Sequence, residues 1–267
     1  MRKTGRIAGI VLAVFVLVAV LAPVLPLADP YRIDLDSLRL PPSWEHPFGT
    51  DSKGRDIFSR VLHGGQISIS VAVAAAVIAA LIGFGVGLVS GYCGGKVDTV
   101  LMAAVDFILS FPSLLLAVAI SVILPPGIYT VMIAIACVGW TSFARIVRGQ
   151  VLSYKEMPFV EAARSYGCSH WRIALFHIAP LCIPICLVVM GIKLGGFVLT
   201  EATLGFLGLG AQPPTPTWGA MISANRAYIL SAPWTVFFPG LAIFLTAFCC
   251  NLLGDSLKER SDLRIKE

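Results

Sequence analysis

Apolar residues gather in six long runs along this chain, with shorter polar segments between them. The runs cover about residues 7–27, 67–91, 99–124, 128–147, 178–204 and 234–253. A helix needs roughly 20 mostly apolar residues to cross the hydrocarbon core of a bilayer, and each run reaches that length. Lipid offers no partner to an unpaired backbone N–H or C=O group, so such runs are predicted to be helical. The pattern therefore predicts an all-α integral membrane protein with six transmembrane helices.

Composition and charge support the same class. Hydrophobic residues make up 57% of the chain and charged residues 13%, and the mean hydropathy is +0.85. An ordinary soluble domain has about 25% charged residues, so that class is excluded. The formal net charge of +5 could suggest nucleic acid. The basic residues, however, are scattered at the ends of the runs, so we expect no nucleic-acid partner and attribute the charge to orientation in the membrane lipid.

The basic residues also predict which side of the membrane each polar segment occupies. A signal peptide cleaved near Ala22 or Ala28 is the alternative for the first run, but that run is too long for one. With the N-terminus inside, 13 basic residues lie on the cytoplasmic side and six on the other, as the positive-inside rule requires. The 13 are Arg2, Lys3, Arg6, Lys96, Arg145, Arg148, Lys155, Arg164, Arg172, Lys258, Arg260, Arg264 and Lys266, and the six are Arg32, Arg39, Lys53, Arg55, Arg60 and Arg226. We expect both termini and the 145–177 segment in the cytoplasm.

Small residues recur along the second run, which carries Gly83, Gly85, Gly87 and Gly91. Small side chains let membrane helices approach closely. Two interpretations remain open: packing within this subunit, or a pore-lining face shared with a partner subunit.

The segment between the fourth and fifth runs carries a spaced motif. Glu161-Ala162-Ala163 is followed after three residues by Gly167, and a His-Ile-Ala-Pro sequence ends at Pro180. This spacing resembles the coupling-loop motif of ABC importer permeases. In that motif the ending is I-x-L-P, so His177 and Ala179 stand where an Ile and a Leu are expected.

Three further stretches narrow the resemblance. They are HPFGTDSKGRDIFSR (46–60), DFILSFPSLLLA (106–117) and GFLGLGAQPPTPTWGAMI (205–222). With them the chain resembles the second, C-type permease subunit of the dipeptide, oligopeptide and nickel importers. The resemblance implies a type I ABC importer transmembrane fold in the cell membrane. It divides the chain into an N-terminal helix with an extracytoplasmic segment (1–65), a transmembrane core with the coupling loop (66–255) and a cytoplasmic tail (256–267).

The resemblance also implies partners. They are a homologous permease that completes a heterodimer, two ABC ATPase subunits that bind ATP and Mg²⁺, and an extracytoplasmic substrate-binding protein. A short helix at Glu161, Ala162 and Ala163 is expected to lie in a groove of an ATPase subunit. The Glu161 carboxylate would cap or pair there, and Gly167 would let the chain leave the helix in a left-handed conformation.

Sequence signatures of catalysis are absent. No G-x-x-x-x-G-K-[ST] phosphate-binding loop, H-E-x-x-H or G-x-S-x-G stretch occurs, so we expect no enzyme and no cofactor bound by this chain. His177, Cys182 and Cys186 could be imagined as metal ligands. Cysteine in a membrane helix is usually a small apolar residue, so no metal site is expected.

Residues 29–66 form the longer outside segment, interrupted by four prolines. A short amphipathic helix over Arg55–His63 is predicted, capped by Thr50, Asp51 or Ser52. The segment is interpreted either as a solvated lid or, as the resemblance implies, as a contact for the substrate-binding protein. Candidate receptor-side residues are Asp51, Arg55, Asp56 and Trp218, with Trp218 and Trp234 expected as aromatic anchors at the membrane surface.

Three ionisable residues fall within the apolar runs. Asp106 precedes Pro112, where a kink is predicted, and is expected to line the pathway or brace the kink. Lys193 lies 15 residues beyond Ile178, which is about 22 Å along a helix and past the midplane. It either snorkels to the surface or faces the translocation cavity, where it would attract a substrate carboxylate. Glu201 is the third candidate, eight residues further on.

The predicted function is that of a permease subunit of an ATP-driven importer, moving peptides or related small solutes by alternating access. Nickel and metal-chelating opines are the alternative substrates, because relatives with the same motifs carry them. A passive channel is the competing class, and it would have no use for the coupling motif.

Overall fold

The computed structural model describes residues 3–264, and within this range the chain forms helices and no strand. Arg2 and Lys266, two residues used to orient the chain, lie outside the described residues, as does the end of the predicted 256–267 tail. The helices are α1 (Lys3–Leu21), α2 (Ile57–Cys93), α3 (Gly95–Leu109), α4 (Ser113–Ile123), α5 (Ile128–Lys155), α6 (Pro158–Ser165), α7 (His170–Arg172), α8 (Ala179–Phe206), α9 (Trp218–Asn225) and α10 (Trp234–Arg264). A π-helix over Ile173–Ile178 joins α7 to α8.

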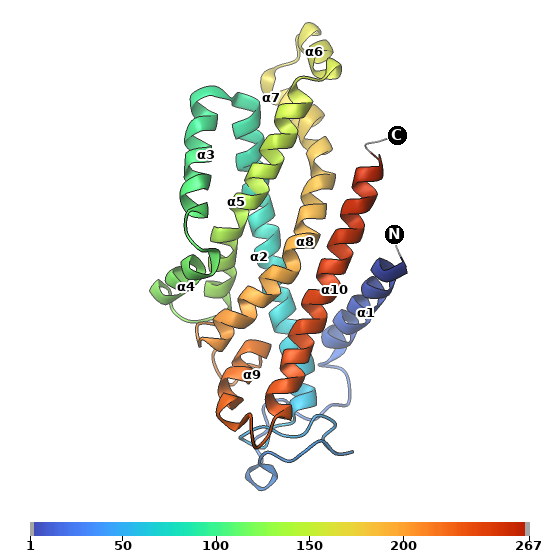
Figure 1. The fold of residues 1–267 in the computed structure, drawn as a ribbon, viewed down its shortest axis with the longest axis vertical. Helices are drawn as coiled ribbons and strands as arrows, with labels where there is room; N and C mark the ends of the chain where they lie inside the picture. Colours follow the sequence, from blue (N-terminus) through green and yellow to red (C-terminus); the bar gives the residue numbers. More distant parts are fainter. Residues whose placement is uncertain (1–2, 265–267) are drawn as a thin grey trace.

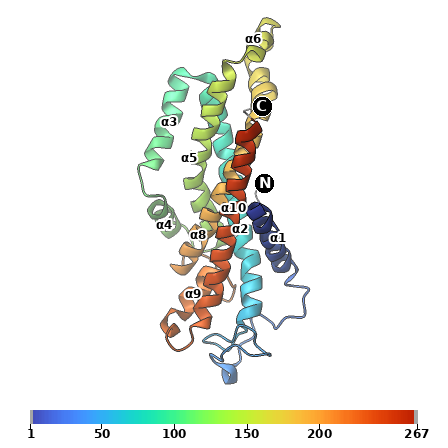
Figure 2. The ribbon, with the colours of Figure 1, turned by 45° about the vertical axis from the view of Figure 1, so that its right-hand side comes forward.

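Long helices run side by side between two unlike ends of the molecule (Figures 1 and 2). The short helix α6 occupies one end, and the irregular 22–56 segment and α9 occupy the other. Helices α2, α5 and α10 run toward the α6 end and α8 runs back, while α1 begins and α10 ends toward α6. The chain thus crosses the length of the bundle in alternating directions.

Four helical stretches are long and apolar enough to cross a membrane: Ile57–Cys93, Ile128–Lys155, His170–Phe206 and Trp234–Ser256. The pair α3 and α4 supplies a fifth span if its two bent halves count as one. The first predicted run is a shorter apolar helix, Gly5–Leu21. An all-helical membrane fold is confirmed, and the count of six spans stays a prediction.

The third predicted helix is broken rather than kinked. Its halves, α3 and α4, meet at an angle of 89°. The Ser110 N–H donates to the Asp106 carbonyl to close α3, and the Pro112 carbonyl accepts from the Leu116 N–H to open α4. Proline has no N–H to continue the helical ladder, so the chain turns at this point.

The predicted short helix over Arg55–His63 is wrong, because these residues lead directly into the 37-residue α2. Its N-cap is Asp56, whose carboxylate accepts the Ser59 N–H at 2.7 Å. The three predicted caps, Thr50, Asp51 and Ser52, lie four to six residues before this position, and the Asp51 carboxylate instead accepts the N–H groups of Lys53 and Arg55.

Glycines in α2 let that helix pack closely against α5. A Cβ atom added to Gly83, Gly87 or Gly91 would collide with α5, whereas one added to Gly85 would meet open space. Three small residues spaced four apart lie on one helical face, so α2 and α5 pack backbone against backbone. The interpretation of packing within the subunit is confirmed for these three positions.

Candidate coupling site and translocation cavity

Helix α6 carries the predicted coupling residues and separates them into two faces. Pro158 stands at its first turn, where a missing N–H costs nothing. Ala163, with 8% of its surface exposed, and the fully buried Val160 pack against the bundle, while Glu161 and Ala162 are exposed. Among the described residues, the Glu161 carboxylate has no hydrogen-bond or ion-pair partner. Figure 1 shows α6 projecting at the end of the molecule, so its outer face is free for another protein.

Gly167 ends the α6 turn in a left-handed conformation, as the sequence predicts, with φ of +78°. The Gly167 N–H donates to the Arg164 carbonyl at 2.9 Å, and the Cys168 N–H donates to the Ala163 carbonyl at 3.1 Å. These bonds satisfy carbonyls that the helix end would leave unpaired. Any residue with a Cβ is disfavoured at such a φ, so glycine fixes the direction in which the chain leaves α6.

Tyr92, at the end of α2, forms hydrogen bonds with residues on both sides of α6 in the sequence. Its hydroxyl and Nδ1 of His170 are hydrogen-bonded at 3.1 Å, and its carbonyl accepts from the Lys155 ammonium at 2.8 Å. Tyr92 also belongs to a buried apolar cluster that includes Val147, Val160 and Ile173. Residues from α2, α5, α6 and the π-helix therefore pack together as one unit.

Beside α6 the surface is aromatic and hollowed. Trp171 and Phe176 are mostly exposed, and they line a depression together with Arg172 and His177. Cys182, in contrast, is buried in the core. Between residues 3 and 264, no group of three His, Cys, Asp or Glu side chains is placed to hold a metal ion.

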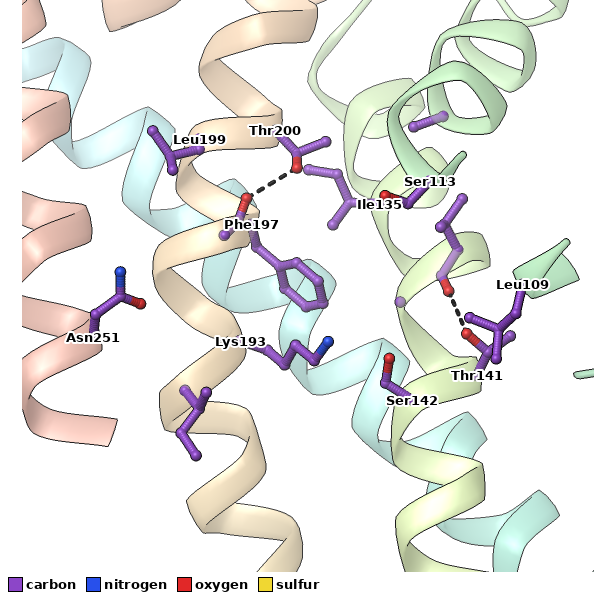
Figure 3. A pocket seen from close by; sticks show the side chains of 15 residues that line it. Leu109, Ser113, Ile135, Thr141, Ser142, Lys193, Phe197, Leu199, Thr200 and Asn251 are labelled. Atoms are coloured by element: carbon purple, nitrogen blue, oxygen red, sulfur yellow. Dashed lines mark hydrogen bonds between the residues drawn. The ribbon is translucent and has the colours of Figure 1, made fainter. Parts of the chain in front are cut away.

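A cavity of about 430 Å³ opens among α4, α5, α8 and α10 (Figure 3). Apolar side chains such as Phe197 form most of its wall. Its polar members are Ser113, Thr141, Ser142, Lys193, Thr200 and Asn251. The cavity lies between the two ends of the long helices, where a translocation pathway would run.

Lys193 is the only one of the three predicted pathway residues that lines this cavity. Figure 3 shows its side chain extending from α8 toward Ser142 of α5. Glu201 is instead buried near Ser68 of α2 with 3% of its surface exposed, and its Oε2 atom has no hydrogen-bond partner among the described residues. Glu201 is on a different face of α8 and is not among the residues that line this cavity, so its place on the pathway stays a prediction.

Asp106 pairs with Arg145 rather than lining the cavity. Its Oδ1 accepts from Nη2 of Arg145 at 2.6 Å, which links α3 to α5. Both side chains are more than half exposed. Of the two roles considered for Asp106, this contact favours bracing of the broken helix.

The four candidate receptor-side residues are all buried, with 6% or less of each exposed. The Asp51 carboxylate accepts from Nε of Arg55 at 2.7 Å, and Asp56 pairs with Nδ1 of His46 at 2.9 Å. Trp218 donates from its indole to the Val61 carbonyl at 2.9 Å. These side chains hold the segment together instead of forming its outer surface, and Trp218 is a core residue rather than a membrane-surface anchor.

Nearby carboxylates of this segment are also engaged. Asp34 accepts the Asp36 N–H at 3.0 Å and the Ser37 hydroxyl at 3.0 Å. These hydrogen bonds, the backbone one first, lower the pKa of Asp34 below its ordinary value.

Sequence reasoning missed the hydroxyl and amide groups of the cavity and the exposed Trp44. Trp44 stands fully in solvent within the 22–56 segment. The signal for the cavity was present, since Thr141, Ser142 and Asn251 are polar residues inside or at the end of apolar runs. Such residues face a neighbouring helix or a watery space more often than lipid.

Comparisons with known proteins agree with the geometry. Residues 83–267 match the family model described as "Binding-protein-dependent transport system inner membrane component". The chain is 41% identical to a probable D,D-dipeptide transport system permease protein of Escherichia coli K12, over 95% of this chain and 85% of that one. It is 42% identical to a dipeptide transport system permease protein of Alkalihalophilus pseudofirmus, over 99% and 87%.

A third relative and one solved structure complete the comparison. The chain is 46% identical to a glutathione transport system permease protein of Escherichia coli O157:H7, over 87% of this chain and 77% of that one. An inward-facing structure of the MetNI methionine ABC transporter superimposes with a TM-score of 0.60 and 19% identity, covering 75% of this chain and 95% of the other. At that identity the likeness concerns the fold alone.

Proposed function

This chain belongs to the inner-membrane components of binding-protein-dependent transport systems, and from that premise we propose how it works within its importer. It is a permease subunit of an ABC importer in the cell membrane. We propose that it forms one half of the translocation pathway and that partner subunits hydrolyse ATP.

One observation supports the coupling part of the proposal. One face of α6 is exposed to solvent, and the opposite face packs against the helix bundle. Glu161 and Ala162 face solvent, whereas Val160 and Ala163 pack into the buried cluster that contains Tyr92. An ATPase subunit that binds the exposed face would push or pull α6 against the long helices. Two alternative packings of those helices, biased from this end by ATP, give alternating access.

The proposed topology has six spans, with α1 and the α3–α4 pair each crossing once. In it α6, the start of α1 and the end of α10 lie in the cytoplasm. The alternating direction of the helices in Figure 1 and the charge bias of the sequence support this assignment. A homologous permease would cover the exposed Asp106–Arg145 pair, since a charged pair facing lipid is costly.

The 22–56 segment would then face outward, toward the substrate-binding protein. Asp51, Arg55, Asp56 and Trp218 support it from beneath, and Trp44 is its most exposed aromatic side chain. Aromatic side chains are enriched at protein interfaces, so Trp44 is the proposed contact.

We propose peptides as the substrate class, because the relatives above are named for dipeptide, D,D-dipeptide and glutathione transport. A nickel importer is the alternative within the same family. A passive channel is the less favoured function, because it gives no role to α6.

Site-directed cross-linking tests the coupling proposal. A photoreactive amino acid at Ala162, in the complete transporter, is expected to label an ATPase subunit, whereas the same residue at Trp44 is expected to label the substrate-binding protein. Labelling of lipid alone at position 162 would refute the assignment of α6.

A further inference from the structure

The cavity contains one cation without a partner. Within the described part of the chain, the Lys193 ammonium makes no ion pair and no hydrogen bond, although the side chain is only partly exposed. A lysine at membrane depth is costly to insert, so an unpaired one is expected to serve a function.

Three other charged side chains, Arg145, Asp106 and Asp255, lie one helical turn from cavity-lining residues, and Asp255 is one turn beyond the cavity-lining Asn251. Arg145 is one turn beyond the cavity-lining Thr141 and Ser142, and Asp106 is one turn before the cavity-lining Leu109. These two side chains are hydrogen-bonded at 2.6 Å. Arg145 is therefore neutralised by Asp106, and Lys193 is the one charged residue among those that line the cavity.

One neutral hydroxyl lies near the ammonium, that of Ser142 opposite it on α5. Thr200 lies two turns further along α8, where its hydroxyl donates to the Gly196 carbonyl, and Asn251 lines the cavity from α10 on the other side of α8. Hydroxyl and amide groups donate hydrogen bonds to a carboxylate without competing for the cation. Most of the remaining wall is apolar, which strengthens a charge-assisted hydrogen bond made inside it.

We propose that Lys193, with the Ser142 hydroxyl opposite it, forms a binding site for one carboxylate of the transported substrate. The inference deepens the proposed function and rests on it. A peptide presents such a group at its C-terminus, whereas a bare divalent cation such as nickel is repelled by the ammonium. The site thus favours peptides over nickel among the substrates considered.

The test uses the complete transporter in proteoliposomes, with its receptor outside and ATP inside. The probe is a pool of di- and tripeptides with free C-termini, and uptake is measured by mass spectrometry. Lys193→Met keeps the length of the side chain without its charge and is expected to lower ATP-driven uptake at least tenfold, or about 1.4 kcal/mol. Lys193→Arg is expected to stay within about threefold of wild type, because it keeps the charge. Lys96→Met removes an exposed lysine at the start of α3, far from the cavity, and is expected to have no effect.

Chemical restoration of a positive charge at position 193 distinguishes an electrostatic role of Lys193 from a packing role. Lys193→Cys, in a background where the exposed Cys93 and Cys137 are Ser, is treated with 2-aminoethyl or 2-sulfonatoethyl methanethiosulfonate. The aminoethyl reagent restores a cation and is expected to restore uptake, while the sulfonate is not. Full uptake by Lys193→Met, or equal effects of both reagents, would overturn the carboxylate site and leave the proposed function intact. Absence of ATP-driven peptide uptake by the wild type would overturn the proposed peptide substrate, and the carboxylate site with it.

Discussion

Replacement of Gly167 tests whether backbone conformation at the end of α6 controls coupling. Its φ of +78° suits glycine, and a Cβ atom there would meet no neighbour within 4 Å. The penalty for a substitution is therefore backbone strain, about 1 to 2 kcal/mol for an ordinary L-residue and more for a β-branched one. Strain of that size lowers the population of the correctly directed α6 about fivefold to thirtyfold.

The expected order of uptake is Gly167→Asn, then Gly167→Ala, then Gly167→Val, because asparagine tolerates the left-handed region best. Gly167→Ala is expected to lower ATP-driven uptake by about fivefold to thirtyfold, the factor that the strain supplies, and Gly167→Val is expected to lower it further. Gly149→Ala is the matched control, since it also adds a Cβ in open space but without a positive φ. Uptake and ATP hydrolysis are measured on the same reconstituted complexes. Wild-type uptake by Gly167→Val, or an Asn variant as defective as the Val variant, would refute the conformational explanation.

Three other predictions follow from the packing and the topology. Gly87→Leu is expected to prevent stable assembly because its side chain collides with α5, whereas Gly85→Leu is expected to be tolerated; equal thermal stability of the two purified variants would contradict this. Tyr92→Phe removes a hydrogen bond worth about 1 kcal/mol and is expected to reduce coupled uptake several-fold with little loss of ATP hydrolysis; parallel loss of both rates would argue against a linking role. In a background without exposed native cysteines, Ser43→Cys is expected to react with an impermeant thiol reagent added outside and Ser169→Cys is not; the reverse pattern would invert the topology.

Sequence alone was sufficient wherever a local pattern fixes the structure. The apolar runs predicted α2, α5, α8 and α10, since length and hydropathy suffice to place a helix in lipid. The left-handed turn at Gly167 was also predicted, because only the residue type and its place after a short helix are needed.

Other features depend on contacts between distant segments. Trp218 is buried because Gly64 and Gly65 of α2 leave room for its ring, and no local pattern reports that fit. Lys193 and Glu201 are eight residues apart, about 80° around the helix, and the crossing of α2 near Ser68 decides which of them meets the cavity. The 89° angle at Pro112 is likewise set by how α4 packs on α5, so proline predicts only that the helix is interrupted.

The central claim is that this subunit couples ATP hydrolysis by its partner subunits to the movement of a substrate across the membrane. Uptake into proteoliposomes that contain the purified transporter tests it most directly, with loaded receptor outside and ATP or a non-hydrolysable analogue inside. We predict accumulation above the external concentration with ATP and none with the analogue. Equilibration of the substrate across the membrane without ATP would show a passive channel and contradict this account.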